Sequence, residues 1–260
     1  MTPPSRNGLS TIEEVIADAK AGKLFILVDD EDRENEGDLC VIGEYATADS
    51  INFMAKYGRG LICLALTRIR TEQLGLTMME RRNESRHETA FTISIEAREG
   101  VTTGISAADR ALTIKTAIDP NCGERDITTP GHIFPLIARD GGTLVRAGHT
   151  EAVVDIARAC GSDNPSGVIC EIMNDDGSMA RRPELEAFAE AHGLAIGTIA
   201  DLIQYRATTE TTVEMVREEA IETEFGPFRL QMFQDQILGG THLCLIKGQP
   251  SPDRPCLVRV

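Results

Sequence analysis

Apolar positions at helical spacing mark the first element of the chain. Four side chains recur at three- and four-residue intervals and would share one buried helix face: Ile12, Val15, Ile16 and Ala19. Ser10 precedes Glu13 by three residues, which is the spacing of a capping box, and Gly22 suits the helix end. The pattern predicts an amphipathic helix that begins at about Ser10.

Short apolar runs without that period predict strands, and longer periodic stretches between them predict helices. Strands are expected at 24–28, 39–42, 61–66, 90–97, 132–138, 167–177 and 194–199. Helices are expected near 47–57, after the 100–106 loop with Ser106 and Asp109 in capping register, within 144–161, and over 183–192. Strands and helices do not alternate strictly, so we predict an α/β (α+β) fold in which helices cover a mixed sheet.

The pattern changes after about Arg206. Residues 207–226 are rich in Thr and Glu and predict a linker or an exposed helix. Three short strand-like runs follow, FRLQMF, THLCLIKG and CLVRV, and they are too few to build an independent core. We therefore expect a main domain over 1–206 and a smaller segment over 207–260.

Composition narrows the class of partner and compartment. The formal net charge of -15 and the isoelectric point of about 4.8 argue against nucleic acid or an anionic membrane as a partner. No apolar run is long enough to span a bilayer, and the opening MTPPSRNGLS has no hydrophobic leader core. Seven scattered cysteines without a C-x-x-C pair indicate reduced thiols and a cytoplasmic protein.

An acidic stretch lies between two apolar runs. The segment ILVDDEDRENEGDL holds seven carboxylates and one cation, Arg33. A solvated loop is the ordinary interpretation, and an EF-hand is excluded because Gly37 comes too late and no helix precedes the loop. Glu34, Glu36 and Asp38 are the hard oxygen ligands that magnesium prefers, which makes a metal site the alternative.

A second segment, LVRAGHTEAVVDIARACG, could bind phosphate. Arg146, Gly148 and His149 lie just ahead of a predicted helix near Thr150, and a helix N-terminus offers free N–H groups to an anion. An ordinary helix entry is the competing interpretation. Glu171 inside the apolar run VICEIM is either a solvent-facing strand end or a carboxylate with a role. With His132 as a further proton carrier, the residues indicate metal-dependent acid–base chemistry on a small phosphorylated carbonyl compound.

Five segments in this order resemble the 3,4-dihydroxy-2-butanone 4-phosphate synthase family of riboflavin biosynthesis: DDEDRENEGDL, GVTTGISAADR, TPGHIFPLIA, RAGHTEA and GVICEIMNDDGSMAR. The resemblance covers roughly residues 8–206, with the loop before Glu171 about one residue longer than expected. It implies a three-layer fold, a homodimer with sites near its interface, and a lyase. The reaction enolises D-ribulose 5-phosphate, rearranges its skeleton and releases one carbon as formate.

The resemblance also assigns residues. It implies Glu34 and His149 as ligands of magnesium (or manganese), and His132 and Glu171 as catalytic, with Glu36 and Cys63 as further members of the site. The residues that it implies contact substrate are Arg33, Glu34, Asp38, Thr103, Arg146, Ala147, Gly148, His149, Thr150 and Glu171. Two rival classes remain: a regulatory module that binds the sugar phosphate without releasing formate, and a metal-dependent sugar-phosphate isomerase or aldolase.

The tail resembles the opening of the GTP cyclohydrolase II domain that follows the synthase in bifunctional members. Only Cys244 and Cys256 remain there, twelve positions apart, without the close thiolate spacing that zinc requires. We expect no GTP cyclohydrolase activity from this chain.

Overall fold

A computed structural model describes residues 8–80 and 89–260. Residues 1–7 of the opening MTPPSRNGLS, in which we found no hydrophobic leader core, lie outside the described residues. The chain divides into two compact units, Met1–Arg206 and Ala207–Val260.

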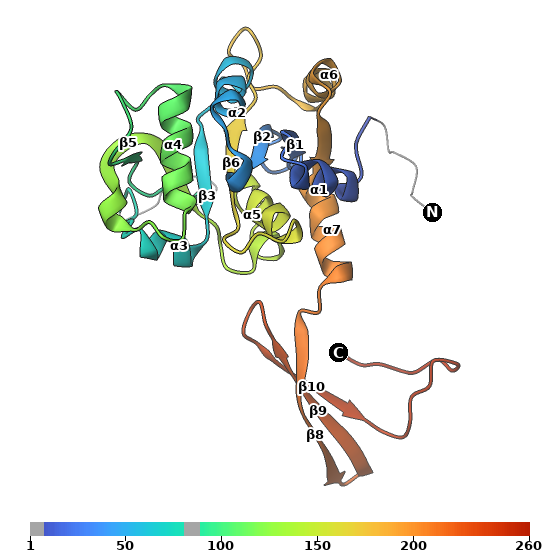
Figure 1. The fold of residues 1–260 in the computed structure, drawn as a ribbon. Coiled ribbons are helices and arrows are strands. Elements are labelled where there is room, and N and C mark those ends of the chain that lie inside the picture. Colours follow the sequence, from blue (N-terminus) through green and yellow to red (C-terminus); the bar gives the residue numbers. More distant parts are fainter. Residues whose placement is uncertain (1–7, 81–88) are drawn as a thin grey trace. The chain divides into compact units, whose positions relative to one another are not determined.

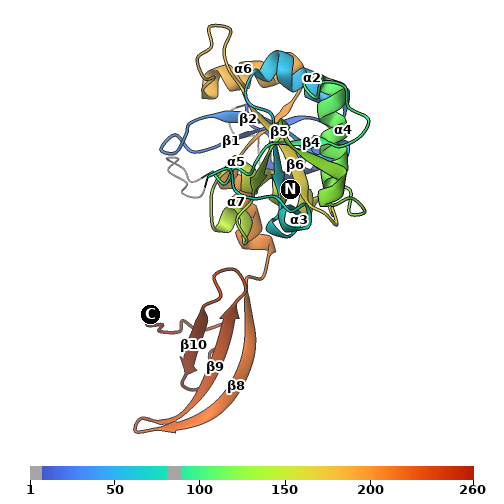
Figure 2. The same cartoon turned by 90° about the vertical axis from the view of Figure 1, so that its left-hand side faces the viewer.

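The first unit is built on a seven-stranded mixed sheet in the order β4-β5-β3-β6-β2-β1-β7 (Figures 1 and 2). The strands are β1 Phe25–Val28, β2 Gly37–Ile42, β3 Cys63–Leu66, β4 Ile95–Ala97, β5 Ile127–Ile137, β6 Ser166–Glu171 and β7 Ala195–Thr198. β1 and β7 pair in parallel, as do β3 and β5, whereas β6 is antiparallel to both of its neighbours, β2 and β3. The beginnings of β2 and β3 therefore meet the end of β6 at one edge of the sheet.

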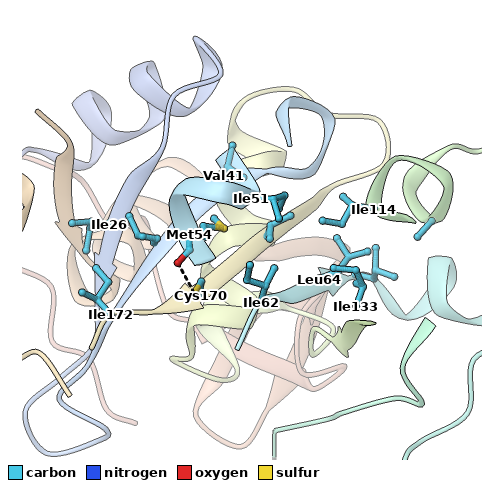
Figure 3. Close-up of a cluster of buried hydrophobic side chains, with 14 of the residues drawn as sticks. Ile26, Val41, Ile51, Met54, Ile62, Leu64, Ile114, Ile133, Cys170 and Ile172 are labelled. Carbon is cyan, nitrogen blue, oxygen red and sulfur yellow. Dashed lines mark hydrogen bonds between the residues drawn. The ribbon is translucent and has the colours of Figure 1, made fainter. Parts of the chain in front are cut away.

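Helices cover both faces of this sheet, which confirms the predicted three-layer α/β arrangement (Figure 1). They are α1 Ile12–Lys20, α2 Ala48–Phe53 continuing into a π-helical turn Met54–Gly58, α3 Arg68–Gln73, α4 Ala107–Ile118, α5 His149–Ala159, α6 Arg182–His192 and α7 Ile199–Thr209. Alternate side chains of each strand enter one of two cores. Ile26 and Val41 pack with α2 and α4 (Figure 3), while Phe25 and Cys40 pack with α1, α5 and α7.

Local capping differs by one residue from the prediction at the first helix. Thr11, not Ser10, caps α1, because its hydroxyl accepts the N–H of Glu14 while the Glu14 carboxylate accepts the N–H of Thr11. The Ser10 N–H instead donates to Ile196 O on β7. α4 begins at the predicted cap, Ser106.

Two segments of the first unit depart from the periodicity. Residues 90–97 were expected to form one alternating strand, but only β4 is continuous, and Phe91 and Thr92 form isolated bridges. The strand expected at 194–199 ends at Thr198, and Ile199 instead begins α7, a helix that the pattern did not predict and whose Leu202 and Arg206 are buried. In both segments the secondary structure depends on contacts with distant parts of the chain, which a local sequence pattern does not contain.

The second unit is a three-stranded antiparallel sheet in the order β10-β9-β8. Its strands are β8 Val213–Thr223, β9 Gly226–Asp235 and β10 Thr241–Ile246, while the expected strand at 256–260 is absent. None of the residues 207–260 is buried, which is typical of three strands with little apolar area between them.

Candidate active site

A pocket opens where the beginnings of β2 and β3 meet the end of β6 and the start of α5. Most of the residues expected from sequence line it: Arg33, Glu34, Glu36, Asp38, Cys63, Arg146, His149, Thr150 and Glu171. Sheet register explains part of this grouping, since Asp38 on β2 pairs directly with Glu171 on β6. Cys63 on β3 pairs with the neighbouring Ile169.

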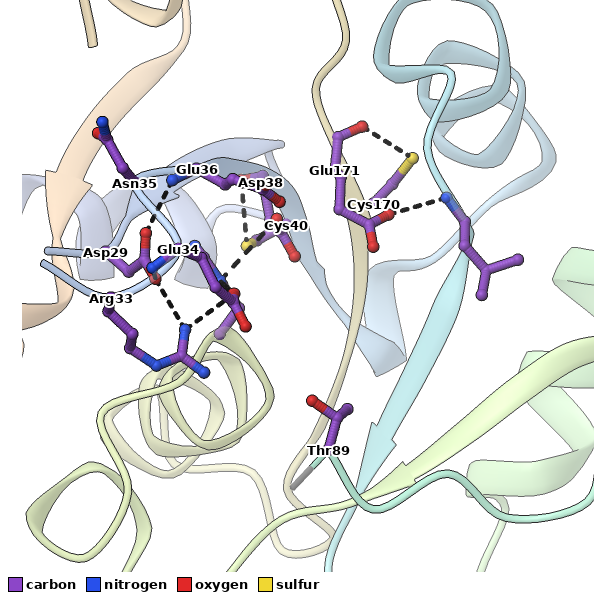
Figure 4. A network of polar contacts seen from close by, with 12 residues as sticks. Asp29, Arg33, Glu34, Asn35, Glu36, Asp38, Cys40, Thr89, Cys170 and Glu171 are labelled. Carbon is purple, nitrogen blue, oxygen red and sulfur yellow. Dashed lines mark hydrogen bonds and ion pairs between the residues drawn. The ribbon is translucent and has the colours of Figure 1, made fainter. Parts of the chain in front are cut away.

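The acidic loop is organised by Asp29, a residue that the sequence did not single out. Its buried carboxylate accepts the backbone N–H groups of Glu36 at 2.8 Å and Glu34 at 3.1 Å. Arg33 Nη1 donates to the same carboxylate at 2.7 Å (Figure 4). Asn35 takes a left-handed conformation, φ 55°, which turns the chain between the two glutamates. The loop is therefore held in a fixed shape, with Glu34 and Glu36 lining the pocket.

Glu34 and His149 form the pair best placed to hold a cation. Glu34 Oε2 lies 3.7 Å from His149 Nδ1, and Asp38 Oδ1 lies 4.0 Å from the same nitrogen. Two ligands of one magnesium ion, each at about 2.1 Å, stand about 3–4 Å apart, so Glu34 and His149 fit. Asp29 belongs to the same cluster, whose ligand atoms all lie within 4.8 Å, but its oxygens already accept three donors.

His149 is the first residue of α5 and is buried. Its Nε2 has no hydrogen-bond partner among the described residues, a costly arrangement for a buried imidazole unless a ligand completes it. The residue before it, Gly148, caps the helix without a side-chain acceptor. The first N–H groups of α5 therefore face this site without a protein cap, as an anion-binding helix start requires.

The crowded carboxylates shift the ionisation of the site. Burial raises the pKa of Asp38 to about 7, with Glu171, Glu34 and Glu36 adding to the rise and His149 opposing it. Burial lowers the pKa of His149, but Asp38, Glu34 and Asp29 outweigh it and bring the pKa to about 9. Without a metal, Asp38 can therefore take up or release a proton near neutral pH.

Glu36 and Cys63 are also held toward their protonated forms. Burial, followed by the charge of Glu34, raises the pKa of Glu36. Burial raises the pKa of the Cys63 thiol well above its ordinary value, and Glu171 and Asp38 push in the same direction. Cys63 is therefore a neutral thiol at the pocket wall, not a nucleophilic thiolate.

Arg146 lies in the pocket wall beside the helix start. Its Nη1 donates to the buried carboxylate of Glu151 at 2.6 Å, and its Nη2 donates to Thr89 Oγ1 at 3.1 Å. Glu151 also accepts the backbone N–H of Arg139 at 2.9 Å. A Cβ on Gly148 would stand 2.2 Å from Arg146 Nη1, so only glycine lets the guanidinium fold back over the helix start.

Glu171 is aimed by the turn before β3. One of its carboxylate oxygens accepts the N–H of Leu61 at 2.8 Å. A Cβ on Gly60 would lie 2.5 Å from that same oxygen, so glycine leaves room for the carboxylate. Glu171 is the half-buried last residue of β6, and it also lines the pocket. Each of the two interpretations offered from sequence is therefore partly right.

The remaining expected residues do not line this pocket. Ala147 and Gly148 connect Arg146 to His149. Thr103 lies on the loop before α4, and His132 lies on β5, where its Nδ1 is 2.7 Å from Glu96 Oε2. The structure thus divides the expected site into two groups, one in the pocket and one beside β4.

Sequence reasoning also passed over residues that shape the pocket: Asp29, Leu61, Thr89, Phe91 and Glu151. Asp29 and Glu151 belong to the two motifs already singled out. Each is an acidic residue close in sequence to a basic or metal-binding candidate, and this could have indicated that it positions that neighbour. Leu61 and Phe91 belong to ordinary apolar runs and carried none.

Comparison with known proteins agrees with these features. Residues 13–205 match the family model for 3,4-dihydroxy-2-butanone 4-phosphate synthase, and residues 214–260 match that for GTP cyclohydrolase II. A 3,4-dihydroxy-2-butanone 4-phosphate synthase of Pseudomonas aeruginosa is 58% identical over 252 residues, covering 97% of this chain and 69% of that protein. The riboflavin biosynthesis protein RibBA of Aquifex aeolicus is 54% identical, covering 96% of this chain and 62% of that protein.

Solved structures give the same relationship. RibBX of A. baumannii, a two-domain 3,4-dihydroxy-2-butanone 4-phosphate synthase, is 51% identical with a TM-score of 0.84, covering 92% of this chain and 70% of that one. A synthase in complex with two magnesium ions is 39% identical with a TM-score of 0.75, covering 77% of this chain and 98% of that one. None of the helices among the described residues is long and apolar enough to cross a membrane. The chain belongs to the 3,4-dihydroxy-2-butanone 4-phosphate synthase family.

Proposed function

We infer that this protein is a lyase of riboflavin biosynthesis that converts D-ribulose 5-phosphate to 3,4-dihydroxy-2-butanone 4-phosphate and formate. The observation that carries the inference is the pocket itself, in which Glu34, His149 at the start of α5 and the neighbouring Arg146 line one space. A carboxylate and an imidazole suit a cation, and an arginine beside a helix start suits a phosphate. The family match supports the same reaction.

The cation that we propose is magnesium, held by Glu34 and His149. Four carboxylates line the pocket against two arginines, so an anionic substrate needs a cation to offset the excess negative charge. A bound magnesium ion would polarise the substrate oxygens and stabilise negative charge as the enolate develops. The magnesium-bound relative supports this choice. Manganese, which has similar hard-ligand preferences, is the alternative.

The side chains of the chain supply positioning and proton transfer. Arg146 and the N–H groups at Thr150 would hold the phosphate, and Arg33 lies at the opposite wall. Asp38 and Glu171 face the same space from adjacent strands, so they can take and return protons next to the carbonyl. We assign Glu36 and Cys63 to shaping and hydrogen bonding around the substrate.

The protein would act as a homodimer. Thr103 and His132 lie outside the pocket of their own chain, and His132 is 42% exposed. A second copy of the chain could bring this surface to the pocket, which would unite the two groups of expected residues. Light scattering tests this arrangement, and a stable, fully active monomer would contradict it.

The domain division that we propose assigns the reaction to residues 1–206 and leaves 207–260 as a linker and a cyclohydrolase-like segment. Cys244 and Cys256 are exposed, and neither belongs to a cluster of three potential metal ligands among the described residues. The match to GTP cyclohydrolase II covers only residues 214–260, and we propose no GTP ring opening by this chain. The free cysteines support a cytoplasmic location, where thiols stay reduced.

Formate release from D-ribulose 5-phosphate, with and without EDTA, tests the function. Formate that appears with magnesium and stops with EDTA supports it. A different sugar phosphate as product would favour the isomerase or aldolase class, and binding without turnover would favour the regulatory module. Glu34→Gln should keep the fold and lower kcat at least about 100-fold, whereas the exposed Glu31→Gln in the same loop should not.

A further inference from the structure

A second polar cluster lies beside β4, around the carboxylate of Glu96. Its Oε2 is 2.7 Å from His132 Nδ1, and the Glu96 side chain is only 12% exposed, compared with 42% for His132. The loop that carries Thr103 closes over the same carboxylate, because Gly104 lies directly against it. His132 and the loop that carries Thr103 thus both lie against one carboxylate that no motif had marked.

The backbone is built to hold this pair. β4 pairs Ile95 with Ile133 and then Glu96 with Thr128, so residues 129–132 are extra on β5 and carry His132 out of the ladder. Gly104 has φ +88°, and a Cβ there would stand 2.0 Å from Glu96 Oε1. A Cβ on Gly131 would stand 2.0 Å from Ile95 O. Both close approaches require glycine. They let the chain pack tightly around Glu96, whose side chain is 12% exposed, whereas the side chain of His132 is 42% exposed.

The hydrogen bond defines the tautomer of His132. An ionised carboxylate only accepts hydrogen bonds, so Nδ1 must be the donor. In the neutral imidazole Nε2 then carries the lone pair and can accept a proton. The imidazole is therefore presented to its surroundings as a base at Nε2.

Glu96 differs from buried carboxylates whose two oxygens both accept hydrogen bonds from the protein. Asp109 accepts from Thr102 and Gly104, and Glu151 accepts from Arg139 and Arg146, so both oxygens of each are used. Glu96 Oε1 is buried and has no hydrogen-bond partner among the described residues. Within residues 8–80 and 89–260, the one hydrogen bond of its side chain goes to an accessible histidine, which is the arrangement of a residue that orients a base.

We propose that Glu96 is a positioning residue for the lyase reaction. It keeps neutral His132 as the Nδ1–H tautomer, so that Nε2 accepts one proton from the substrate and later returns it. While the proton is held, the Glu96 carboxylate stabilises the imidazolium, and no atom or electron is gained or lost overall. This proposal rests on the proposed function and on His132 reaching substrate in the homodimer.

Nuclear magnetic resonance of the full chain labelled with 15N-histidine tests the tautomer directly. The His132 signals are assigned by their loss in His132→Gln, and the tautomer is read from spectra taken at alkaline pH. Wild type should show His132 with its proton on Nδ1, and Glu96→Ala should move the proton toward Nε2. Wild-type His132 protonated on Nε2 would overturn the proposal.

Formate kinetics on the same proteins test the role. Glu96→Ala should lower kcat about 10- to 100-fold, a part of the contribution of general acid–base catalysis, while KM changes only a few-fold. Glu99→Ala, an exposed glutamate three residues on, is the matched control and should leave both constants unchanged. Glu96→Gln keeps the shape, and its kcat should follow whichever tautomer its amide imposes.

The outcomes separate this proposal from the function on which it rests. No formate from wild type would defeat the proposed function, although the tautomer could still be read. Formate from wild type together with an undiminished kcat in Glu96→Ala, or a kcat that does not follow the tautomer in Glu96→Gln, would defeat the positioning role alone.

Discussion

Asp155, buried in the middle of α5, holds two arginines of very different exposure. Its Oδ2 accepts Arg206 Nη1 of α7 at 2.7 Å, and its Oδ1 accepts Arg158 Nη1 at 2.8 Å. Thr143 adds its N–H at 2.7 Å and its hydroxyl at 2.8 Å. The side chain of Arg206 is 10% exposed and that of Arg158 is 42% exposed. Asp155 therefore takes part in one buried and one exposed ion pair, whose strengths can be compared in the same protein.

The geometry orders three alanine substitutions by their effect on the free energy of unfolding. Asp155→Ala leaves a buried guanidinium and the Thr143 N–H without this acceptor, which costs about 3–5 kcal/mol. Arg206→Ala removes the hydrogen bond to Gly141 O as well as the one to Asp155. The bond to the charged carboxylate is worth about 1.5–3 kcal/mol, and Asp155 keeps its other donors. Arg158→Ala removes an exposed pair worth at most about 1 kcal/mol. The last variant is the matched control.

Urea unfolding followed by the helical circular dichroism signal measures these differences. All helices of the described residues end by Thr209, so the signal reports on the first unit. The double variant Asp155→Ala with Arg206→Ala should be less destabilised than the sum of the two single variants, because the pair interacts directly. Equal losses for Arg206→Ala and Arg158→Ala would refute the reasoning that burial sets the strength of this pair.

Three further outcomes follow from the site and the end of the first unit. Arg146→Lys should raise KM at least about 10-fold, because lysine lacks the planar guanidinium that donates to Glu151 and that we propose also binds the phosphate. An unchanged KM would place the phosphate elsewhere, such as at the loop before α4. Without metal, the melting temperature should fall as pH rises through about 7 and about 9. Folding raises the pKa values of Asp38 and His149 to these values, so the folded protein keeps protons that the unfolded chain has already released, and that stabilisation is lost as the pH rises. Magnesium, which needs the neutral imidazole, should reverse that fall, and a flat metal-free profile measured by differential scanning calorimetry would contradict the raised pKa values. Truncation after Glu210 should keep formate release, since it retains all of α7, and loss of activity in that fragment would show that the tail is needed.

Local pattern predicted most elements of the first unit and marked the motifs as candidate sites. It did not predict α7, and it predicted a linker or an exposed helix where β8 lies. Buried strands such as β1 and β6 are short apolar runs, and α5 has its apolar side chains on one face. The spacing of apolar residues therefore predicts which residues are buried. The acidic loop and the arginine before α5 were marked as a metal and phosphate site because carboxylates and guanidinium groups have few other uses when held at the edge of a core. The same local information failed at 90–97, where alternation is present but only β4 finds a continuous partner.

Only the tertiary structure decided which residues meet. Strand order brings Asp38 beside Glu171, although they lie far apart in the chain, and antiparallel pairing puts both at one sheet edge. It also assigned Asp29 to holding the loop and Glu96 to His132, because a carboxylate's role depends on the donors that reach it. Sequence determines which groups can ionise, bind or donate. Which partner each one finds depends on packing between distant segments, and that cannot be read from neighbours along the chain.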